Sequence, residues 1–383
     1  MTPATINFSL NNNTGSNVYA YIVGRDYSTK WPLFIQADGK TVYHPAEPSE
    51  RLQPLETDCA IALDRGNPTT VTIPQMISGR LYFCLDSKLT FSLNPKDEDD
   101  PLPGPGVVQP SVLDPTDVNN DLNWTFVEFT YDPGLLFANI TYADWVSWPI
   151  SLQLRNTSNA VQTVQGLSAG ALDKICEGLI AQEAQDGAGW SKLIVKGPDG
   201  KPLRVLSPNL AVSKDATLFE GYYQAYVDKV WSKYSDEDLK ISLDEKRAAT
   251  GRVVDGLLAF DDGHKVPQPS AVDIFSCNKG AFAETQGDAG ILNRNLAAAC
   301  NRSTLLIDSN LPENEDASTY YKSDPTNHYA RILHELNIDG RGYAFPYDDV
   351  RPSNAANTEG SVSDTNPDLL MITLKAPGDS AAA

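Results

Sequence analysis

Residues 124–154 read WTFVEFTYDPGLLFANITYADWVSWPISLQL. This segment predicts two strands joined by a turn, because Phe126–Tyr131 alternates aromatic and β-branched residues and D-P-G chemistry follows it. After a short apolar loop, Ile140–Ser147 predicts the second strand. Each predicted strand carries one carboxylate near its middle, Glu128 and Asp144. A carboxylate inside an apolar strand is costly unless it has a partner or faces a cleft.

The two acids allow two interpretations. In the first they are solvated side chains on an edge strand or a cleft wall, since acids in clefts are only a probabilistic sign of a site. In the second they face one groove, because neighbouring antiparallel strands bring distant residues together. Two such carboxyls are what glycoside hydrolysis requires, one as an acid and one as a base or nucleophile.

The central segment resembles a known family. Glu128-Phe129-Thr130, Tyr142-Ala143-Asp144 and the Pro-Ile at 149–150 are similar to the core of the thaumatin-like superfamily. Within it, the chain resembles the laminaripentaose-producing β-1,3-glucanases of glycoside hydrolase family 64. The segments Gly342–Val350 and Gly166–Leu172 agree with this resemblance. It extends from about residue 17 to about residue 375, so it covers most of the chain.

The resemblance implies an inverting, endo-acting enzyme on β-1,3-glucan that releases short oligosaccharides, laminaripentaose among them. Glu128 would be the general acid and Asp144 the general base, separated by about 6.5–9.5 Å. Phe137 would stack on a glucose ring, where the family often has a tryptophan. Asn139 stands where ordinary thaumatin-like proteins tend to have aspartate, which favours the glucanase. The other residues expected to bind substrate are Thr130, Asp132, Thr141, Tyr347 and Asp349.

The rest of the chain predicts a mainly β fold with an inserted α/β part: a thaumatin-like β-sandwich or barrel domain and a mixed α/β domain beside a wide groove. We expect the first part of the β domain over 1–165, the insertion over 166–262, a return to the β domain over 263–376 and a disordered tail over 377–383. The expected helices are a helix capped by Ser168 that runs to about Gln185, a second over Thr217–Tyr234 and a third over Asp288–Cys300. Gly342–Val350 is expected to form a strand.

Composition limits the partners. The chain of 383 residues has 41% hydrophobic residues, enough for a large core. Its 30 basic and 50 acidic residues give a net charge of -20, which repels nucleic acid and anionic membranes. No apolar run reaches the roughly 18 residues of a membrane span. We expect a monomer that acts on β-1,3-glucan and uses no cofactor.

Compartment and cysteine pairing stay open. The polar start, Met1–Asn7, contains no signal peptide, as in a mature secreted form with an added methionine or in a cytosolic protein. Sequons begin at Asn12, Asn123, Asn139, Asn156 and Asn301, which gives weak support for a secreted protein, the location we expect. Among five cysteines, Cys277 and Cys300 are expected to pair, Cys59 and Cys84 are a second candidate pair, and Cys176 is expected to be free.

Other functional classes fit less well. A non-catalytic β-glucan-binding or defence protein could use the same fold, because folds do not determine function. Gly166–Gly170 matches the G-x-S-x-G pattern of serine hydrolases, but the preceding chain is not a parallel core strand and Ser168 suits a helix N-cap. The four histidines lie far from metal-ligand spacing, so no metal site is expected.

Overall fold

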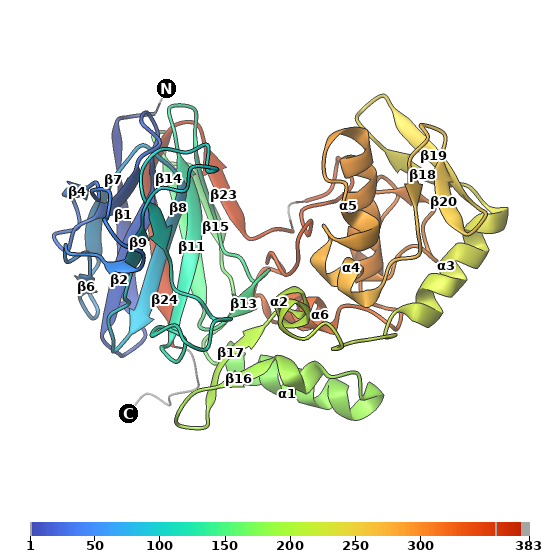
Figure 1. Cartoon of the computed structure of the whole chain (residues 1–383), viewed down its shortest axis with the longest axis horizontal. Coiled ribbons are helices and arrows are strands. Elements are labelled where there is room, and N and C mark those ends of the chain that lie inside the picture. The colour runs from blue at the N-terminus through green and yellow to red at the C-terminus, as the bar shows by residue number, and fades with distance from the viewer. Residues whose placement is uncertain (1, 357, 377–383) are drawn as a thin grey trace.

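The computed structural model describes residues 2–356 and 358–376, and Figure 1 shows two lobes joined at one side. One lobe consists of β-strands and holds the N-terminal part of the chain. The other contains most of the helices with two small sheets, and the space between the lobes gives the molecule a crescent shape. The mainly β architecture with an inserted α/β part is confirmed. The predicted tail, residues 377–383, lies outside the described residues.

Two large sheets build the first lobe, which we call the barrel lobe. The first has the order β15-β14-β24-β1-β7: β15 (Val161–Val164), β14 (Ile150–Asn156), β24 (Pro367–Lys375), β1 (Thr5–Asn13) and β7 (Thr69–Pro74). The second has the order β23-β12-β11-β8-β2-β3-β4, with β6 beside β2: β23 (Ser361–Asp364), β12 (Leu136–Asn139), β11 (Trp124–Tyr131), β8 (Met76–Leu85), β2 (Val18–Asp26), β3 (Pro32–Ile35), β4 (Val42–Tyr43) and β6 (Ile61–Leu63). A small third sheet contains β5 (Gln53–Pro54), β9 (Ser92–Asn94) and β10 (Gly106–Val108).

The two large sheets face each other across an apolar core. On β11, Val127, Phe129 and Tyr131 are buried, in keeping with the two-residue period of a strand. The ring of Phe129 meets that of Phe8 on β1 edge to face, with centroids 5.2 Å apart. On β8, Gly79 leaves room for Phe129, because a Cβ there would lie 2.7 Å from its ring. The opposite face of β11 is therefore left for the space between the lobes.

The second lobe, which we call the mixed lobe, has two smaller sheets. One has the order β13-β17-β16: β13 (Trp145–Val146), β17 (Pro202–Leu206) and β16 (Ile194–Lys196). The other has the order β21-β20-β19-β18-β22: β21 (Lys265–Val266), β20 (Leu257–Phe260), β19 (Ala248–Val254), β18 (Leu239–Ser242) and β22 (Asn310–Leu311). Its helices are α1 (Ala171–Asp186), α2 (Pro208–Lys214), α3 (Gln224–Asp236), α4 (Ala271–Ser276), α5 (Gly287–Arg302) and α6 (His328–Leu336). Short 3₁₀ turns cover Trp190–Leu193, Gly280–Phe282 and Ala317–Thr319.

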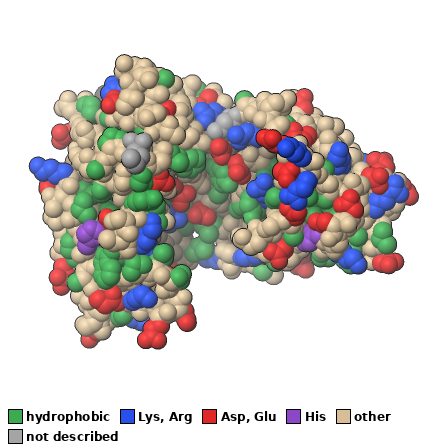
Figure 2. Space-filling view, turned by 90° about the horizontal axis from the view of Figure 1, so that it is seen from above, with side chains coloured by type: hydrophobic (Ala, Val, Ile, Leu, Met, Phe, Trp, Pro, Cys, Tyr) green, Lys and Arg blue, Asp and Glu red, His purple; other side chains and the backbone are tan. Residues whose placement is uncertain are grey.

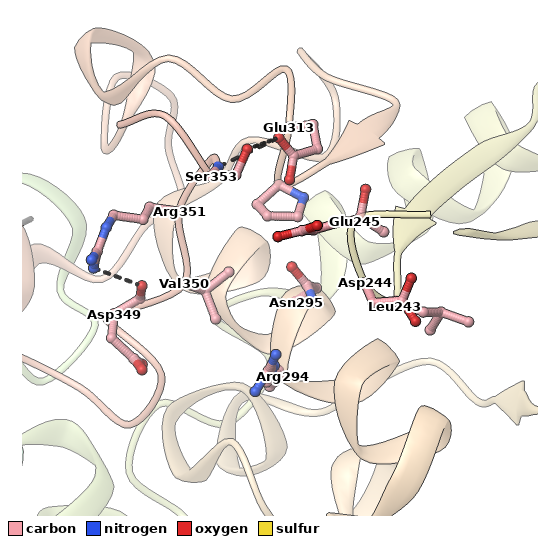
Figure 3. Close-up of a pocket in the computed structure, with 12 residues that line it drawn as sticks. Leu243, Asp244, Glu245, Arg294, Asn295, Glu313, Asp349, Val350, Arg351 and Ser353 are labelled. Atoms are coloured by element: carbon pink, nitrogen blue, oxygen red, sulfur yellow. Dashed lines mark hydrogen bonds between the residues drawn. The ribbon is translucent and has the colours of Figure 1, made fainter. Parts of the chain in front are cut away.

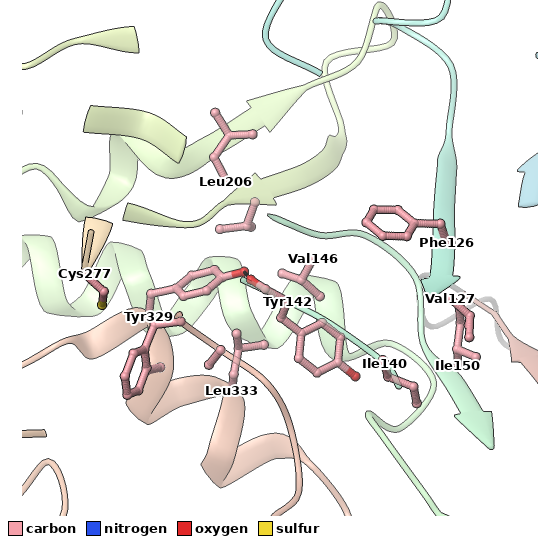
Figure 4. Packing of buried hydrophobic residues seen from close by; sticks show 14 of the residues in the cluster. Phe126, Val127, Ile140, Tyr142, Val146, Ile150, Leu206, Cys277, Tyr329 and Leu333 are labelled. Atoms are coloured by element: carbon pink, nitrogen blue, oxygen red, sulfur yellow. Dashed lines mark hydrogen bonds between the residues drawn. The ribbon is translucent and has the colours of Figure 1, made fainter. Parts of the chain in front are cut away.

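The core continues from one lobe into the other. Figure 4 shows Val127, Ile140 and Ile150 on the barrel side of a cluster that Tyr329 and Leu333 of α6 complete. The Tyr329 hydroxyl donates a hydrogen bond of 2.6 Å to the carbonyl of Tyr142. Continuous burial of this kind holds the two lobes together.

The central segment differs from its prediction after the turn. β11 pairs with β12, so the residues expected to be an apolar loop form the second strand of the hairpin. The predicted strand Ile140–Ser147 is wrong, since only Trp145–Val146 is a strand and it pairs with β17. The sequence could not reveal this, because tertiary pairing selects between two adjacent apolar segments.

Two helix starts also differ. Gly170, in the left-handed conformation at φ 73°, occupies the N-cap of α1, so Ser168 is not its cap. The predicted helix Thr217–Tyr234 begins only at Gln224, because turns occupy the preceding residues. The helix predicted over Asp288–Cys300 is confirmed as α5.

The chain returns to the barrel lobe late. A helix and not a strand follows residue 270, because α4 begins there with a Ser270–Asp273 capping box. Helix α5 packs on β18, and β22 pairs with the same strand. Among the described residues after α6, β23 and β24 are the strands that rejoin the barrel sheets. We therefore propose that the mixed lobe extends from residue 166 to about residue 340, not to 262.

The predicted disulfides are wrong. All five cysteines are free and buried, including the candidate pairs Cys277–Cys300 and Cys59–Cys84. Burial raises the pKa of Cys59, Cys84 and Cys300 to about 12, so these thiols act as small hydrophobic side chains. Among the described residues, no helix has the length and apolar character needed to cross a membrane.

Candidate active site

Glu128 lies on the face of β11 that points away from the barrel core. Strand register places Arg80 of β8 on one side of it and Asn139 of β12 on the other. On the next rung Thr130 faces Phe137. Directly opposed residues share one face of a sheet, so these side chains form a continuous polar and aromatic surface. The predicted residues Glu128, Thr130, Phe137 and Asn139 are brought together.

An ion pair holds Glu128. Arg80 donates hydrogen bonds from Nε (3.2 Å) and Nη2 (3.1 Å) to Oε1 of Glu128. The side chains of Arg80 and Glu128 are each 37% exposed, so water screens the pair partly. Arg80 Nη1 also donates to Gln109 Oε1 at 3.3 Å, and Tyr82 donates to the same oxygen. Within residues 2–356 and 358–376, Glu128 Oε2 has no hydrogen-bond partner, which leaves it available to a ligand.

Asp144 lies in a bend between β12 and β13, not in the middle of a strand as expected. Two backbone bonds hold this segment: Tyr142 N–H donates to the carbonyl of Tyr343 (2.7 Å), and Ser207 N–H donates to the carbonyl of Asp144 (2.8 Å). Burial raises the pKa of Asp144, Arg80 opposes the rise and the negative charge of Glu128 adds to it. The two acids therefore interact electrostatically although they come from different local structures.

Two other predicted residues serve local structure. Asp132 Oδ1 accepts hydrogen bonds from the N–H groups of Gly134 (2.7 Å) and Leu135 (3.0 Å), so it shapes the hairpin turn. Thr141 Oγ1 accepts a hydrogen bond of 3.2 Å from Ala143 N–H. Thr141 also bridges to Tyr343, close to Asp144.

The segment Gly342–Val350 was expected to be a strand, and this is wrong. It forms one bridge at Tyr343 and then turns, with Tyr347 at φ 68°. Asp349 is exposed and accepts a hydrogen bond of 3.3 Å from the Tyr343 hydroxyl. Tyr347 is half-buried. Both predicted residues therefore lie on a turn beside the segment that carries Asp144.

A buried ionic cluster (Arg302, Glu315, His334 and Asp348) holds this turn in place. Arg302 donates to the carbonyls of Asp348 (2.8 Å) and Val350 (2.6 Å) and to Asp348 Oδ1 (3.1 Å). His334 Nε2 lies 2.9 Å from Asp348 Oδ2, which also accepts from Ala344 N–H at 2.9 Å. Burial opposes ionisation of Asp348, yet His334 and Arg302 hold its pKa below the usual range. In His334, burial lowers the pKa, but Asp348 outweighs it and the pKa is raised.

The sequence analysis missed Arg80 and Trp145. The ring centroid of Trp145 lies 4.8 Å from that of Trp124 and 5.1 Å from that of Phe126. Trp145 is only partly buried. Arg80 lies over the ring of Phe126 at 5.0 Å. A charged residue in the apolar strand Gly79–Leu85 was a detectable signal for Arg80. Figure 2 shows that the surface between the lobes is hollowed, with acidic and hydrophobic side chains inside.

The serine-hydrolase alternative finds no support in the geometry. The carbonyl of Ser168 accepts a hydrogen bond of 3.2 Å from Ala171 N–H at the start of α1. The described part of the chain gives the Ser168 hydroxyl no histidine partner.

The chain is similar to known proteins over nearly its whole length. The sequence profile of glycoside hydrolase family 64, described as β-1,3-glucanase, matches residues 4–374. A glucan endo-1,3-β-glucosidase of Cellulosimicrobium cellulans is 29% identical over 97% of the chain, and one of Arthrobacter sp. (strain YCWD3) is 28% identical over the same share. The chain spans 65% of the length of each of these relatives.

Solved structures share the fold. A laminaripentaose-producing β-1,3-glucanase in complex with laminaritetraose superposes with a TM-score of 0.85 at 31% identity, covering 98% of this chain and 99% of the other. A β-1,3-glucanase domain from Clostridium beijerinckii has a TM-score of 0.74 at 20% identity, with 97% and 98% covered, and supports the fold alone.

Proposed function

The chain belongs to glycoside hydrolase family 64, the β-1,3-glucanases, and from this premise we propose that it is an inverting endo-glucanase whose catalytic pair is Glu128 and Asp144. The observation that carries the proposal is the convergence of the two carboxyls. They arise from a strand and a bend, yet both are electrostatically coupled to Arg80 and one raises the pKa of the other. Two carboxyls of this kind are what the hydrolysis of a glycosidic bond requires.

Each acid has a distinct role in the proposed reaction. Water attacks the anomeric carbon, Asp144 accepts its proton, and the glycosidic bond breaks as Glu128 protonates the departing oxygen. Burial, with the negative charge of Glu128, raises the pKa of Asp144, which makes its carboxylate a stronger base. Arg80 donates two hydrogen bonds to Oε1 of Glu128. These bonds fix the carboxyl group, so that Oε2 is the oxygen that would carry the proton to the leaving group.

The substrate we propose is β-1,3-glucan, and the product is short oligosaccharides such as laminaripentaose. A structural relative at 31% identity bears the description laminaripentaose-producing and holds laminaritetraose, which supports this choice. Thr130, Phe137 and Asn139 would contact sugar beside Glu128, with Asp132, Thr141, Tyr347 and Asp349 further along. We add Trp145, a partly buried aromatic ring next to Phe126, as a sugar-stacking residue.

Several finer expectations stay proposals. The barrel lobe would be thaumatin-like, and the protein would be a secreted monomer that binds neither nucleic acid nor membranes. Its net charge of -20 supports the last point. A glycan on Asn139 would obstruct the site, because this residue lies directly beside Glu128. Assaying the culture medium against cell extract would test secretion.

Activity on laminarin tests the catalytic pair. We expect wild-type protein to release short oligosaccharides, and Glu128→Gln or Asp144→Asn to lower kcat by about 10²–10⁴-fold each. Activity that survives in both variants would support the rival, a non-catalytic glucan-binding protein that owes its apparent activity to a contaminant.

The roles within the pair can be separated. A dinitrophenyl laminaribioside has a leaving group that needs no proton. It should restore turnover to Glu128→Gln but not to Asp144→Asn, and azide should restore only the latter. The reverse pattern would exchange the two roles.

A further inference from the structure

A second cavity, of about 550 Å³, opens in the mixed lobe. Its walls come from the end of β18, from α5, from the residues after β22 and from residues 349–353, as Figure 3 shows. Four carboxylates line it: Asp244, Glu245, Glu313 and Asp349. Of these, only Asp349 belongs to the predicted active site. The volume lies within the range of small-molecule sites.

Asn295 of α5 lies at the base of this cavity and has an unused hydrogen-bond acceptor. Only 4% of the residue is exposed. Its Nδ2 donates to the carbonyl of Ile291 at 2.8 Å, whereas Oδ1 is buried and has no partner among the described residues. Figure 3 shows that this oxygen points toward the carboxylates of Glu245 and Glu313. An amide oxygen in this position can accept a hydrogen bond from a ligand that donates one.

The surrounding charges narrow the chemistry of that ligand. Glu245 makes no hydrogen bond or ion pair within residues 2–356 and 358–376, and its carboxylate can only accept. Several acceptors facing one space require hydroxyl or ammonium donors and repel anions. The described residues contain no cluster of three or more His, Cys, Asp or Glu that could hold a metal ion. Arg294 is exposed and makes no hydrogen bond in the described chain, so it can donate to a sugar oxygen. A neutral ligand with several hydroxyls can donate hydrogen bonds to the carboxylates and accept them from Arg294.

The cavity is connected to the active site through Asp349. This residue accepts a hydrogen bond from Tyr343, whose carbonyl in turn binds Tyr142, two residues before Asp144. In Figure 3 Asp349 and Arg351 stand at one side of the cavity, with Leu243 and Glu245 at the other. Asp349 therefore lies both in the lining of the cavity and beside the segment that carries Asp144.

We propose that this cavity is an accessory subsite that binds a glucosyl unit of β-1,3-glucan away from the bond that is cleaved. The proposal rests on the proposed function for its ligand. It gives the mixed lobe a direct part in substrate binding, whereas the predicted sugar contacts lie mostly on the barrel lobe. Sugar hydroxyls would satisfy Asn295 Oδ1 and Glu245, and Arg294 would donate to ring or hydroxyl oxygens.

Binding to an inactive protein tests the subsite without relying on hydrolysis. We would measure the Kd for laminarin and for unbranched curdlan oligosaccharides on the Glu128→Gln/Asp144→Asn double variant. Adding Asn295→Ala or Glu245→Gln should raise the Kd at least fivefold. Adding Glu220→Gln, an exposed acid of the mixed lobe outside the cavity, should change it less than twofold. Melting temperatures would confirm that each variant is folded.

The outcomes separate the two proposals. If affinity falls for both glucans, the cavity binds a glucosyl unit of the unbranched β-1,3-glucan chain. If it falls for laminarin alone, the cavity binds a glucosyl branch. Both results support the subsite. Unchanged Kd values in folded cavity variants would overturn it. Hydrolysis by the Glu128→Gln/Asp144→Asn variant would instead overturn the proposed function and leave the binding result valid.

Discussion

Replacing Asp348 with asparagine should destabilise the protein strongly, whereas the same change at Asp349 should not. Asp348 is 1% exposed and accepts hydrogen bonds from Arg302, His334 and the N–H of Ala344. Asp349 is exposed, and its carboxylate accepts a hydrogen bond of 3.3 Å from the Tyr343 hydroxyl. The two neighbouring acids therefore form a matched pair in which only burial and partners differ.

The magnitude follows from the charge left behind. The Arg302 side chain is 1% exposed, and its other carboxylate neighbour, Glu315, lies 3.9 Å away. Asparagine carries no charge and cannot neutralise Arg302. It also replaces one carboxylate oxygen with an NH₂ group, so one acceptor for the three surrounding donors is lost. Removing one partner of a buried ion pair costs about 3–5 kcal/mol. An exposed substitution such as Asp349→Asn stays within about 0.5 kcal/mol.

Urea unfolding at pH 7, followed by tryptophan fluorescence and by circular dichroism, would measure both variants. Coincident transitions would justify a two-state free energy. A difference below about 1 kcal/mol between Asp348→Asn and Asp349→Asn would refute the reasoning, because the buried ionic cluster would then contribute no more than a surface contact. Since the pKa of Asp348 is lowered in the folded protein, its contribution should persist above about pH 4 and vanish only as the pH falls below that value.

Four further outcomes are expected. Arg80→Met should move the acidic limb of the profile of kcat/KM against pH to higher pH, because Arg80 lowers the pKa of Asp144. An acidic limb that stays in place would show that Arg80 does not affect the pKa of the base. Trp145→Ala should raise KM for laminarin about tenfold, or about 1.4 kcal/mol, while Trp145→Phe keeps most of the affinity; equal effects would argue against stacking. His334→Gln should cost most stability below about pH 6.5 and progressively less as pH rises, since the pKa of His334 is raised; a difference that grows with pH in urea unfolding would contradict this. A thiol reagent should label none of the five cysteines in folded protein and all five after unfolding, and rapid labelling of native protein would contradict their burial.

Local chemistry in the sequence was enough for the first hairpin strand and for the pattern of the barrel. Alternating apolar residues predicted β11, whereas the pairing of β24 with β1 and β14 was visible only in the structure. Helix α5 was confirmed because its apolar residues recur at helical spacing. The same local signals failed where two adjacent apolar segments competed, since β12 and not Ile140–Ser147 pairs with β11.

The sequence by itself also determined which acids to consider, because a carboxylate in an apolar segment such as Glu128 requires a reason to be there. Only the tertiary structure decided their surroundings. The ion pair of Arg80 with Glu128 joins residues 48 positions apart, and the buried cluster joins Arg302 to Asp348 across 46 positions. Asp144 lies in a bend and not in the predicted strand, because the residues after it pair with β17, a strand of the mixed lobe. Such long-range contacts depend on how whole sheets and helices pack, so no local spacing encodes them.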